Sequence, residues 1–209
     1  NTAVGYKALT ANTTGELNTV VGENALLTNT IGKENTVMGN NAMRLNTTGN
    51  YNTAIGVAAL RGNTTASYNV AIGQNALYAN TTGQYNVAIG YAAMRYGTIA
   101  GYNTAVGFNT LYSNTTGIEN VALGSQALYA NTIGIKNVAL GTGTLRFNTT
   151  ASYNTAVGHK ALNINTIGQY NTALGYEALK LNTTAGNNTA VGWQALYTNT
   201  IGQQNVAIG

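Results

Sequence analysis

Side chains that could carry out acid–base, metal or thiol chemistry are scarce in this chain. It contains no Cys and no Asp, His159 is its one histidine, and its five Glu residues show no repeated spacing. A disulfide framework and a zinc cluster both need Cys or several His ligands, and acid–base catalysis by carboxylates needs a positioned pair. We therefore expect no enzyme activity, no metal and no cofactor, and we interpret His159 as a solvated surface residue.

Asparagine and tyrosine recur at regular intervals. The N-x-[S/T] glycosylation pattern occurs at seven asparagines: Asn12, Asn46, Asn63, Asn80, Asn114, Asn148 and Asn182. The equivalent segments elsewhere read NTI or GTI, which do not match the pattern. Because the asparagine mostly remains where the pattern is lost, its conservation along the chain favours a structural role over glycosylation.

Four tyrosines, Tyr51, Tyr68, Tyr85 and Tyr102, are each 17 residues apart. If equivalent residues stack, their rings form one exposed line, which Glu119 and Lys136 interrupt before Tyr153 and Tyr170 resume it. Two interpretations stay open. The row is a stack of rings that stabilises the fold, or it is a contact surface for a glycan, a host receptor or a neighbouring copy.

These spacings belong to one repeat that fills the chain. The block N-[T/V]-[A/V]-aliphatic-G begins at Asn1 and returns every 17 residues up to Asn205, without an insertion. The 209 residues therefore hold twelve complete repeats and five residues of a thirteenth. Residues are referred to below by their position, 1 to 17, in this repeat.

The period predicts the fold. Helical repeats need about 33–47 residues and leucine-rich repeats about 20–29, whereas 17 residues can hold two short strands and two turns. We predict an all-β, parallel β-solenoid (a β-roll or β-helix) with one 17-residue coil per repeat, twelve coils and a partial thirteenth. Residues 1–209 form a single uninterrupted array in this prediction.

Each position of the repeat has an expected place. Gly at position 5 indicates a positive φ or a close approach of neighbouring coils, and position 15, always Gly or Ala, needs a small side chain without a left-handed turn. Strand alternation leads us to place positions 2 and 4 inside, with positions 9 and 14, so that Leu123→Asp would bury a carboxylate. Asparagines at positions 1 and 12 are expected to form ladders of amides between coils. The first members of these rows are Asn1, Asn18, Asn35 and Asn52, then Asn12, Asn29 and Asn46, and Gly5, Gly22 and Gly39.

Charge is low and confined to variable positions. Only 7% of residues are charged, the net charge is +4, and all charges fall at positions 6, 7, 10, 16 or 17. No row is consistently basic and no long apolar run occurs, so we expect neither nucleic-acid binding nor membrane insertion. Because the chain starts and stops within the repeat, without caps, we expect it to be an internal segment of a longer fibre protein.

The interior of so small a coil is thin, so additional burial is expected from side-by-side association of identical solenoids. The Ala rows at positions 3 and 8 would allow their close approach. A cyclic homotrimer is the geometry we expect.

The blocks NTAVG, NVAIG and NVALG, together with the AL…NTTG segment, give the chain a resemblance to known repeats. It resembles the head repeats of trimeric autotransporter adhesins and the NTAVGYxAL…NTTG arrays of phage and viral tail-fibre proteins and bacterial surface proteins. The adhesin repeat is three residues shorter and carries Ser where this chain has Asn. The resemblance implies a left-handed, trimeric β-roll located outside the cell, at a cell surface or on a virion.

Three functions follow as alternatives. The leading one is a structural and adhesive fibre shaft or head that mediates attachment or projects a binding tip, with host glycan or a surface receptor as partner. The second is a filament of solenoids stacked end to end. The third is ice binding by a row of Thr at position 13.

Overall fold

The computed structural model describes residues 1–209 and contains strands and turns but no helix. The chain divides into two compact units, Asn1–Asn103 and Thr104–Gly209. The first unit holds β1 (Thr2–Val4), β2 (Thr19–Val21), β3 (Thr36–Met38), β4 (Thr53–Ile55), β5 (Val70–Ile72) and β6 (Val87–Ile89). The second holds β7 (Thr104–Val106), β8 (Val121–Leu123), β9 (Val138–Leu140), β10 (Thr155–Val157), β11 (Thr172–Leu174), β12 (Thr189–Val191) and β13 (Val206–Ile208).

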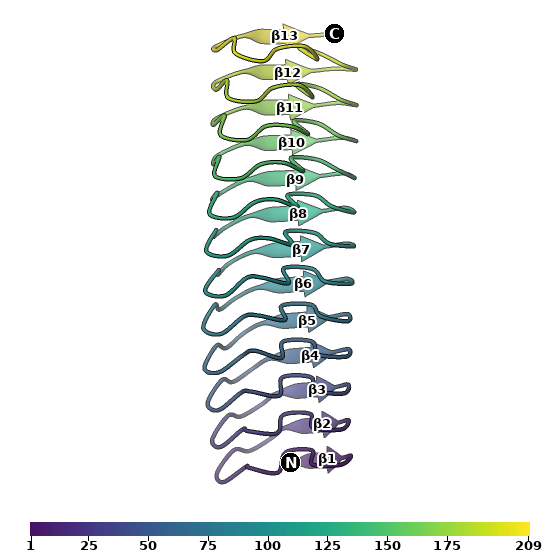
Figure 1. Ribbon diagram of the computed structural model, residues 1–209, viewed down its shortest axis with the longest axis vertical. Helices are drawn as coiled ribbons and strands as arrows, with labels where there is room; N and C mark the ends of the chain where they lie inside the picture. The colour runs from purple at the N-terminus through teal and green to yellow at the C-terminus, as the bar shows by residue number, and fades with distance from the viewer. The chain divides into compact units, whose positions relative to one another are not determined.

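Within each unit every strand pairs in parallel with the strand of the next coil, as Figure 1 shows. The register joins equivalent residues, for example Ala54 with Ala71. This confirms the parallel β-solenoid and its 17-residue coil. The expectation of a second strand in each coil was wrong, because the rest of each coil consists of turns and irregular backbone. Their backbone nevertheless bonds to the adjacent coil, as in the 3.0 Å bond from Leu26 N to Ala42 O.

The strands face the opposite way from our expectation. Position 3 points inward, and Val20 and Ala71 are fully buried. Position 4 points outward, where Met38 and Leu123 are 49% and 50% exposed. Position 2 lies on the same outer face, as Thr19 and Thr36 show. The physical reason is space: the interior is narrow and already holds other rows, so it accepts the small residue of the strand.

Positions 9 and 14 were also expected to point inward, and only position 9 does. The prediction for position 9 is confirmed, since Leu26 and Met43 are fully buried. The prediction for position 14 was wrong, because Ile31 and Ile99 are 48% and 56% exposed. Ala at position 8 is buried too, as at Ala25, so neither Ala row is a surface on which solenoids could meet.

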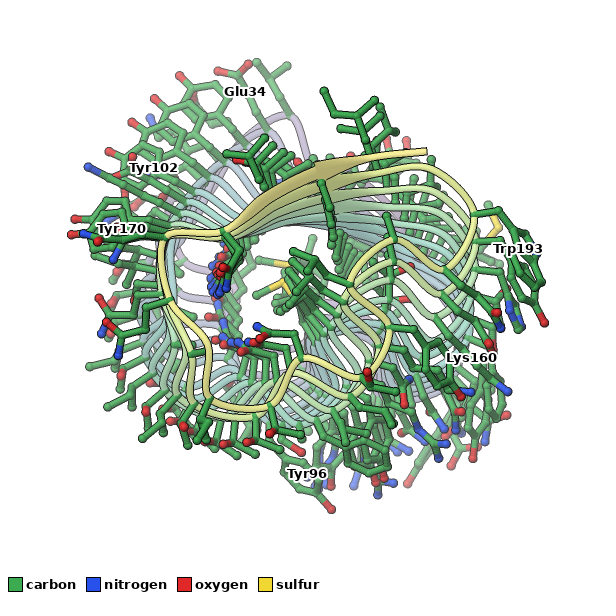
Figure 2. All side chains as sticks on the ribbon, turned by 90° about the horizontal axis from the view of Figure 1, so that it is seen from above. Glu34, Tyr96, Tyr102, Lys160, Tyr170 and Trp193 are labelled. Atoms are coloured by element: carbon green, nitrogen blue, oxygen red, sulfur yellow. The ribbon has the colours of Figure 1, made fainter.

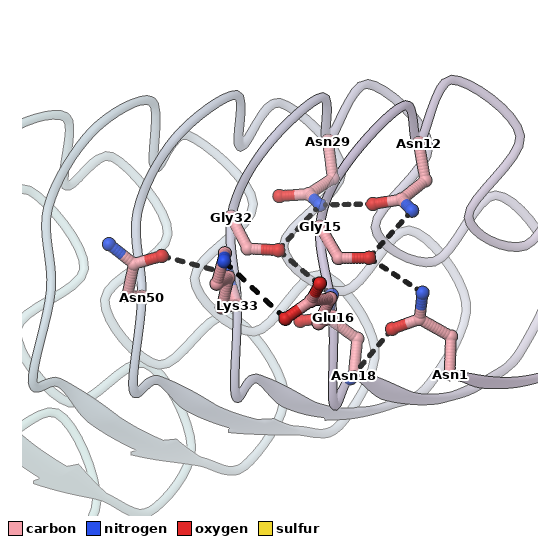
Figure 3. A network of polar contacts seen from close by, with 9 residues as sticks. All are labelled: Asn1, Asn12, Gly15, Glu16, Asn18, Asn29, Gly32, Lys33 and Asn50. Atoms are coloured by element: carbon pink, nitrogen blue, oxygen red, sulfur yellow. Dashed lines mark hydrogen bonds and ion pairs between the residues drawn. The ribbon is translucent and has the colours of Figure 1, made fainter.

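The remaining interior is filled by the two asparagine ladders, which are confirmed. Figure 3 shows their first steps. The backbone N–H of Asn18 donates to Asn1 Oδ1 at 2.8 Å, and Asn29 Nδ2 donates to Asn12 Oδ1 at 2.9 Å. Both ladders converge on position 15, since Gly15 O accepts from Asn1 Nδ2 at 2.7 Å and from Asn12 Nδ2 at 2.9 Å. Apart from one step described below, the ladder amides thus find partners in the adjacent coil or at position 15.

The convergence explains the small residue at position 15. A Cβ at Gly32 would lie 2.6 Å from Gly49 O and also meet the Asn29 amide. Four coils place Ala there, and these methyl groups are buried: Ala66, Ala100, Ala151 and Ala185. None of these residues has a positive φ, as expected.

Position 5 is a different kind of glycine site. Its φ lies between 127° and 143° in all thirteen copies, and a Cβ at Gly22 would lie 2.5 Å from Gly39 O. Both expected reasons for Gly therefore hold. The sequence did not indicate that positions 7, 9 and 17 also have positive φ, for example 54° at Asn24, 48° at Leu26 and 55° at Glu34. Backbone bonds between coils hold these residues in a conformation that costs about 1–2 kcal/mol for each L residue.

One step of the position-12 ladder is missing. Gly97 stands there in place of Asn, and in the preceding coil Asn80 Oδ1 is buried without a hydrogen-bond partner. In other coils this oxygen accepts from the next asparagine, as Asn63 Oδ1 accepts from Asn80 Nδ2 at 3.2 Å. The unpaired oxygen follows directly from the substitution.

We predict that Gly97→Asn stabilises the chain, because it gives Asn80 Oδ1 a donor and Gly97 does not have a positive φ. An unsatisfied buried acceptor costs about 1–3 kcal/mol. Gly97→Ala is the control, since it adds a Cβ without an amide. Thermal unfolding by calorimetry should show a higher melting temperature for the Asn variant than for the Ala variant. Equal melting temperatures would show that the ladder gains nothing at this step.

We predict opposite outcomes for two neighbouring substitutions in β8. Ala122 is fully buried, so Ala122→Asp places an uncompensated charge in the interior and should cost about 3–5 kcal/mol. Leu123 is half exposed, so Leu123→Asp should cost less than about 1 kcal/mol. Thermal denaturation followed by circular dichroism at low micromolar concentration compares them. A larger loss for Leu123→Asp would contradict the assignment of the strand faces.

Candidate contact surface

Tyr51, Tyr68, Tyr85 and Tyr102 form the stacked row that their spacing predicts, and the whole row lies in the first unit. Successive ring centroids are 4.9, 5.0 and 4.9 Å apart, with interplanar angles of 9°, 2° and 16°. All four side chains are exposed, and Figure 2 shows Tyr102 pointing away from the coil. The four rings are called the Tyr ladder below.

The backbone fixes the direction of each ring. Position 17 has a positive φ, 61° at Tyr68, and its N–H donates to the position-16 carbonyl of the preceding coil. For Tyr68 this is a 3.1 Å bond to Asn50 O. Because the same bond recurs at Tyr51, Tyr85 and Tyr102, the side chains leave the backbone in parallel.

Stacking determines which part of the Tyr ladder a partner could reach. Each inner ring, Tyr68 or Tyr85, has another ring on both faces. A sugar that binds an aromatic side chain through its ring face would find these faces covered. Ring edges and hydroxyl groups remain exposed, and they suit hydrogen bonding to a partner's polar groups. The stacked geometry favours the first of the two interpretations, in which the Tyr ladder stabilises the coil stack, and leaves only ring edges and hydroxyl groups for the second.

Glu34 borders the ladder on the N-terminal side, because it holds position 17 in the preceding coil. The Coulombic effect of the Glu34 carboxylate raises the pKa of Tyr51 above its ordinary value of 10.0, and a hydrogen bond to Glu34 acts in the same direction. The phenol of Tyr51 thus stays protonated next to an anion.

A shallow groove adjoins the ladder. It has a volume of about 350 Å³ and is lined by Thr14, Ile31, Lys33, Thr48, Asn50 and Tyr51. Figure 3 shows the ion pair between Lys33 and Glu16, whose Nζ–Oε2 distance is 3.5 Å. Both side chains are about half exposed or more, so this pair adds little stability.

His159 lies at position 6 on the outside, as interpreted, and stacks on Tyr176 at 5.3 Å. Tyr176 stacks in turn on Trp193, whose side chain points outward in Figure 2. No group of three or more His, Cys, Asp or Glu residues is arranged to hold a metal ion. The aromatic stack at position 6 was missed from the sequence because its three members are of different residue types.

The glycosylation-pattern asparagines are part of the interior. Asn46 is fully buried, and its Nδ2 donates to Asn29 Oδ1 at 2.7 Å and to Gly49 O at 3.1 Å. A glycan attached to that nitrogen would have to break both bonds and open the coil.

The Thr hydroxyl groups at position 13 also form hydrogen bonds within the fold. Thr47 Oγ1 donates to Thr64 O at 3.0 Å, and Thr64 Oγ1 donates to Thr81 O at 3.1 Å. Hydroxyl hydrogens bonded to the next coil cannot donate to ordered water, so this row does not favour ice binding.

We predict that Tyr51 ionises above pH 10.0 and that Glu34→Gln lowers its pKa, because the neighbouring anion is removed. Since the folded-state pKa is raised, the Glu34–Tyr51 contact stabilises the fold at lower pH and is lost as pH rises through that pKa. An ultraviolet titration of phenolate absorbance, taken as the difference between the parent and Tyr51→Phe, isolates this group. A Tyr51 pKa that is unchanged by Glu34→Gln would contradict the assignment.

No protein-family model, curated protein or solved structure matches the chain. No helix is long and apolar enough to cross a membrane.

Proposed function

We propose that this chain is a structural segment of an extracellular fibre, a surface adhesin or a phage or virus tail fibre, built by side-by-side association of identical solenoids. The observation that carries the proposal is the exposed aliphatic row on the outer face of the sheet. The closed form we favour is a homotrimer of left-handed coils, in keeping with the adhesin-like sequence blocks.

The outer face of the sheet carries a continuous row of aliphatic side chains in each unit. Within the first unit, position 4 presents Val21, Met38, Ile55, Ile72 and Ile89 in consecutive coils, beside a row of Thr and Val at position 2. Met38 is 49% exposed, and Leu123 and Leu174 in the second unit are 50% and 47% exposed. Contiguous apolar surface of this kind marks an interaction site more often than a solvated face.

The interior shows why such association would matter. Most coils bury one Leu or Met, small residues at positions 3 and 8, and two asparagines, whose side chains are amides rather than apolar groups. The larger aliphatic residues of the strand remain outside. Association through the sheet faces would bury these aliphatic side chains. Each Å² of apolar surface buried contributes about 25 cal/mol of stability, and the single chain buries little such surface in its interior.

The surface chemistry agrees with a shaft rather than a catalyst. The rows described above repeat along the chain and converge on no pocket that combines a nucleophile, a base and an oxyanion-binding group. In this proposal the Tyr ladder stabilises the coil stack, and its hydroxyl edge is the candidate contact for a host glycan or receptor.

Charges placed on the sheet face test the proposal. The triple variant Ile55→Asp, Ile72→Asp and Ile89→Asp puts three carboxylates on the outer face of consecutive strands. We expect the parent to sediment as an oligomer, with a trimer as the favoured state, and the variant to sediment as a monomer with its circular dichroism spectrum retained. Analytical ultracentrifugation at several concentrations measures this.

The matched control changes position 6 in the same three coils, as Val57→Asp, Gln74→Asp and Tyr91→Asp. It adds the same charge at exposed side chains away from the sheet face. The control should sediment like the parent. A monomeric parent at high concentration, or equal dissociation of both variants, would reject association through the sheet face.

A further inference from the structure

Position 10 carries a second ordered row in the first unit. Arg44, Arg61, Tyr78 and Arg95 hold this position in four consecutive coils. No Asp or Glu occurs between residues 35 and 118, so the row lies in a stretch whose formal charges are all positive. We call these four residues the Arg/Tyr row.

The Arg/Tyr row is held by its own contacts. The guanidinium carbons of Arg61 and Arg95 lie 5.6 and 5.7 Å from the ring centroid of Tyr78. Arg61 Nη1 also donates to Tyr78 Oη at 3.1 Å. Tyr78 thus orders two cations that would otherwise repel each other, one in the preceding coil and one in the following coil. Arg61 and Arg95 are thus preorganised around Tyr78, and Arg44 extends the line of positive charge by one coil.

The spacing of the cations suits a linear polymer of anions. Equivalent residues repeat at about 4.8 Å per coil, so Arg44 and Arg61 are about 5 Å apart along the stack, and Arg61 and Arg95 about 10 Å. Guanidinium groups bind carboxylate and sulfate oxygens in a bidentate manner. We propose that the Arg/Tyr row binds an extended acidic polysaccharide lying parallel to the stack of coils.

Nucleic acid fits the row less well. Proteins bind single strands by stacking bases on free aromatic faces, but Tyr78 is in contact with Arg61 and Arg95 on the ring. The ring centroid of Tyr96, the residue after Arg95, lies 5.4 Å from the Arg95 guanidinium carbon, and Tyr96 points outward in Figure 2. A polysaccharide needs only charges and hydrogen-bonding groups, which the row supplies.

The inference does not depend on the proposed self-association. Position 10 belongs to the turns of the coil, whereas the sheet face is formed by positions 2 and 4. A monomeric chain would present the same row, so failure of the association experiment leaves this inference standing, and the reverse also holds.

The test measures binding of fluorescently labelled polygalacturonate oligomers to the intact chain by fluorescence anisotropy at 50 mM NaCl. We expect Arg44→Gln, Arg61→Gln and Arg95→Gln together to weaken binding at least tenfold. Three neutralised anions give a slope of about 2 in log Kd against log salt, so a tenfold rise in salt should weaken parent binding about 100-fold. Unchanged thermal melting shows that the variant is folded, and replacement of the three by Lys should restore part of the affinity.

The control variant, Lys33→Gln, Lys136→Gln and Lys160→Gln, removes the same charge at other positions and should bind nearly as well as the parent. Absence of binding by the parent at 50 mM NaCl would overturn the proposal. An equal loss of affinity in the control variant would show that binding depends only on net charge and would also overturn the proposal. Equal or tighter binding of a single-stranded DNA of matched charge would show that the partner class is wrong.

Discussion

The hydrogen bonding of buried asparagine amides is the constraint on which the rest of this structure depends. An amide inside a fold must have partners, because an unpaired one costs more than most side-chain contacts provide. Here most position-1 asparagines bond to their equivalent one coil away and to the position-15 carbonyl of their own coil, as Asn35 does with Asn18 Oδ1 and Gly49 O, both at 3.0 Å. An inserted residue would displace the whole pattern, which accounts for the uninterrupted 17-residue period.

The ladders also dictate the shape of the interior and, through it, the surface. Two amides and one Leu or Met occupy most of the space in each coil, so the strand can turn only a small residue inward. Ala71 therefore points in, and its neighbours Val70 and Ile72 point out. The aliphatic side chains of the strand therefore lie on the outer face because amide side chains take up space in the interior. This inversion connects the asparagines to the association that we propose.

The features that the asparagine ladders determine could be predicted from the sequence. The choice of which strand face points inward could not, because the alternation of side chains is the same for both faces. The period, the parallel register and the glycine at position 5 follow from residues that recur at constant spacing, such as Gly22. Strand alternation states that positions 2 and 4 share a face but does not say which face is inside. Side-chain size suggested the wrong answer at Ile72 and Leu123. The prediction that position 14 faces inward was wrong for a similar reason, because Ile31 is apolar but exposed. The left-handed backbone at Leu26 carries no residue signal, since bonds to neighbouring coils impose it.

The same regularity explains why we look for function in rows of surface residues. A variable position has no ladder to maintain, yet the coils place its residues in line at a fixed spacing. The line of tyrosines could thus be predicted from the sequence, whereas the covering of their faces depends on side-chain rotamers. In both the Tyr ladder and the Arg/Tyr row, the inner rings contact other side chains of the row. What these rows leave exposed are hydroxyl groups, ring edges and guanidinium charges, so the partner that we propose would have to repeat along its own length to match them at successive coils.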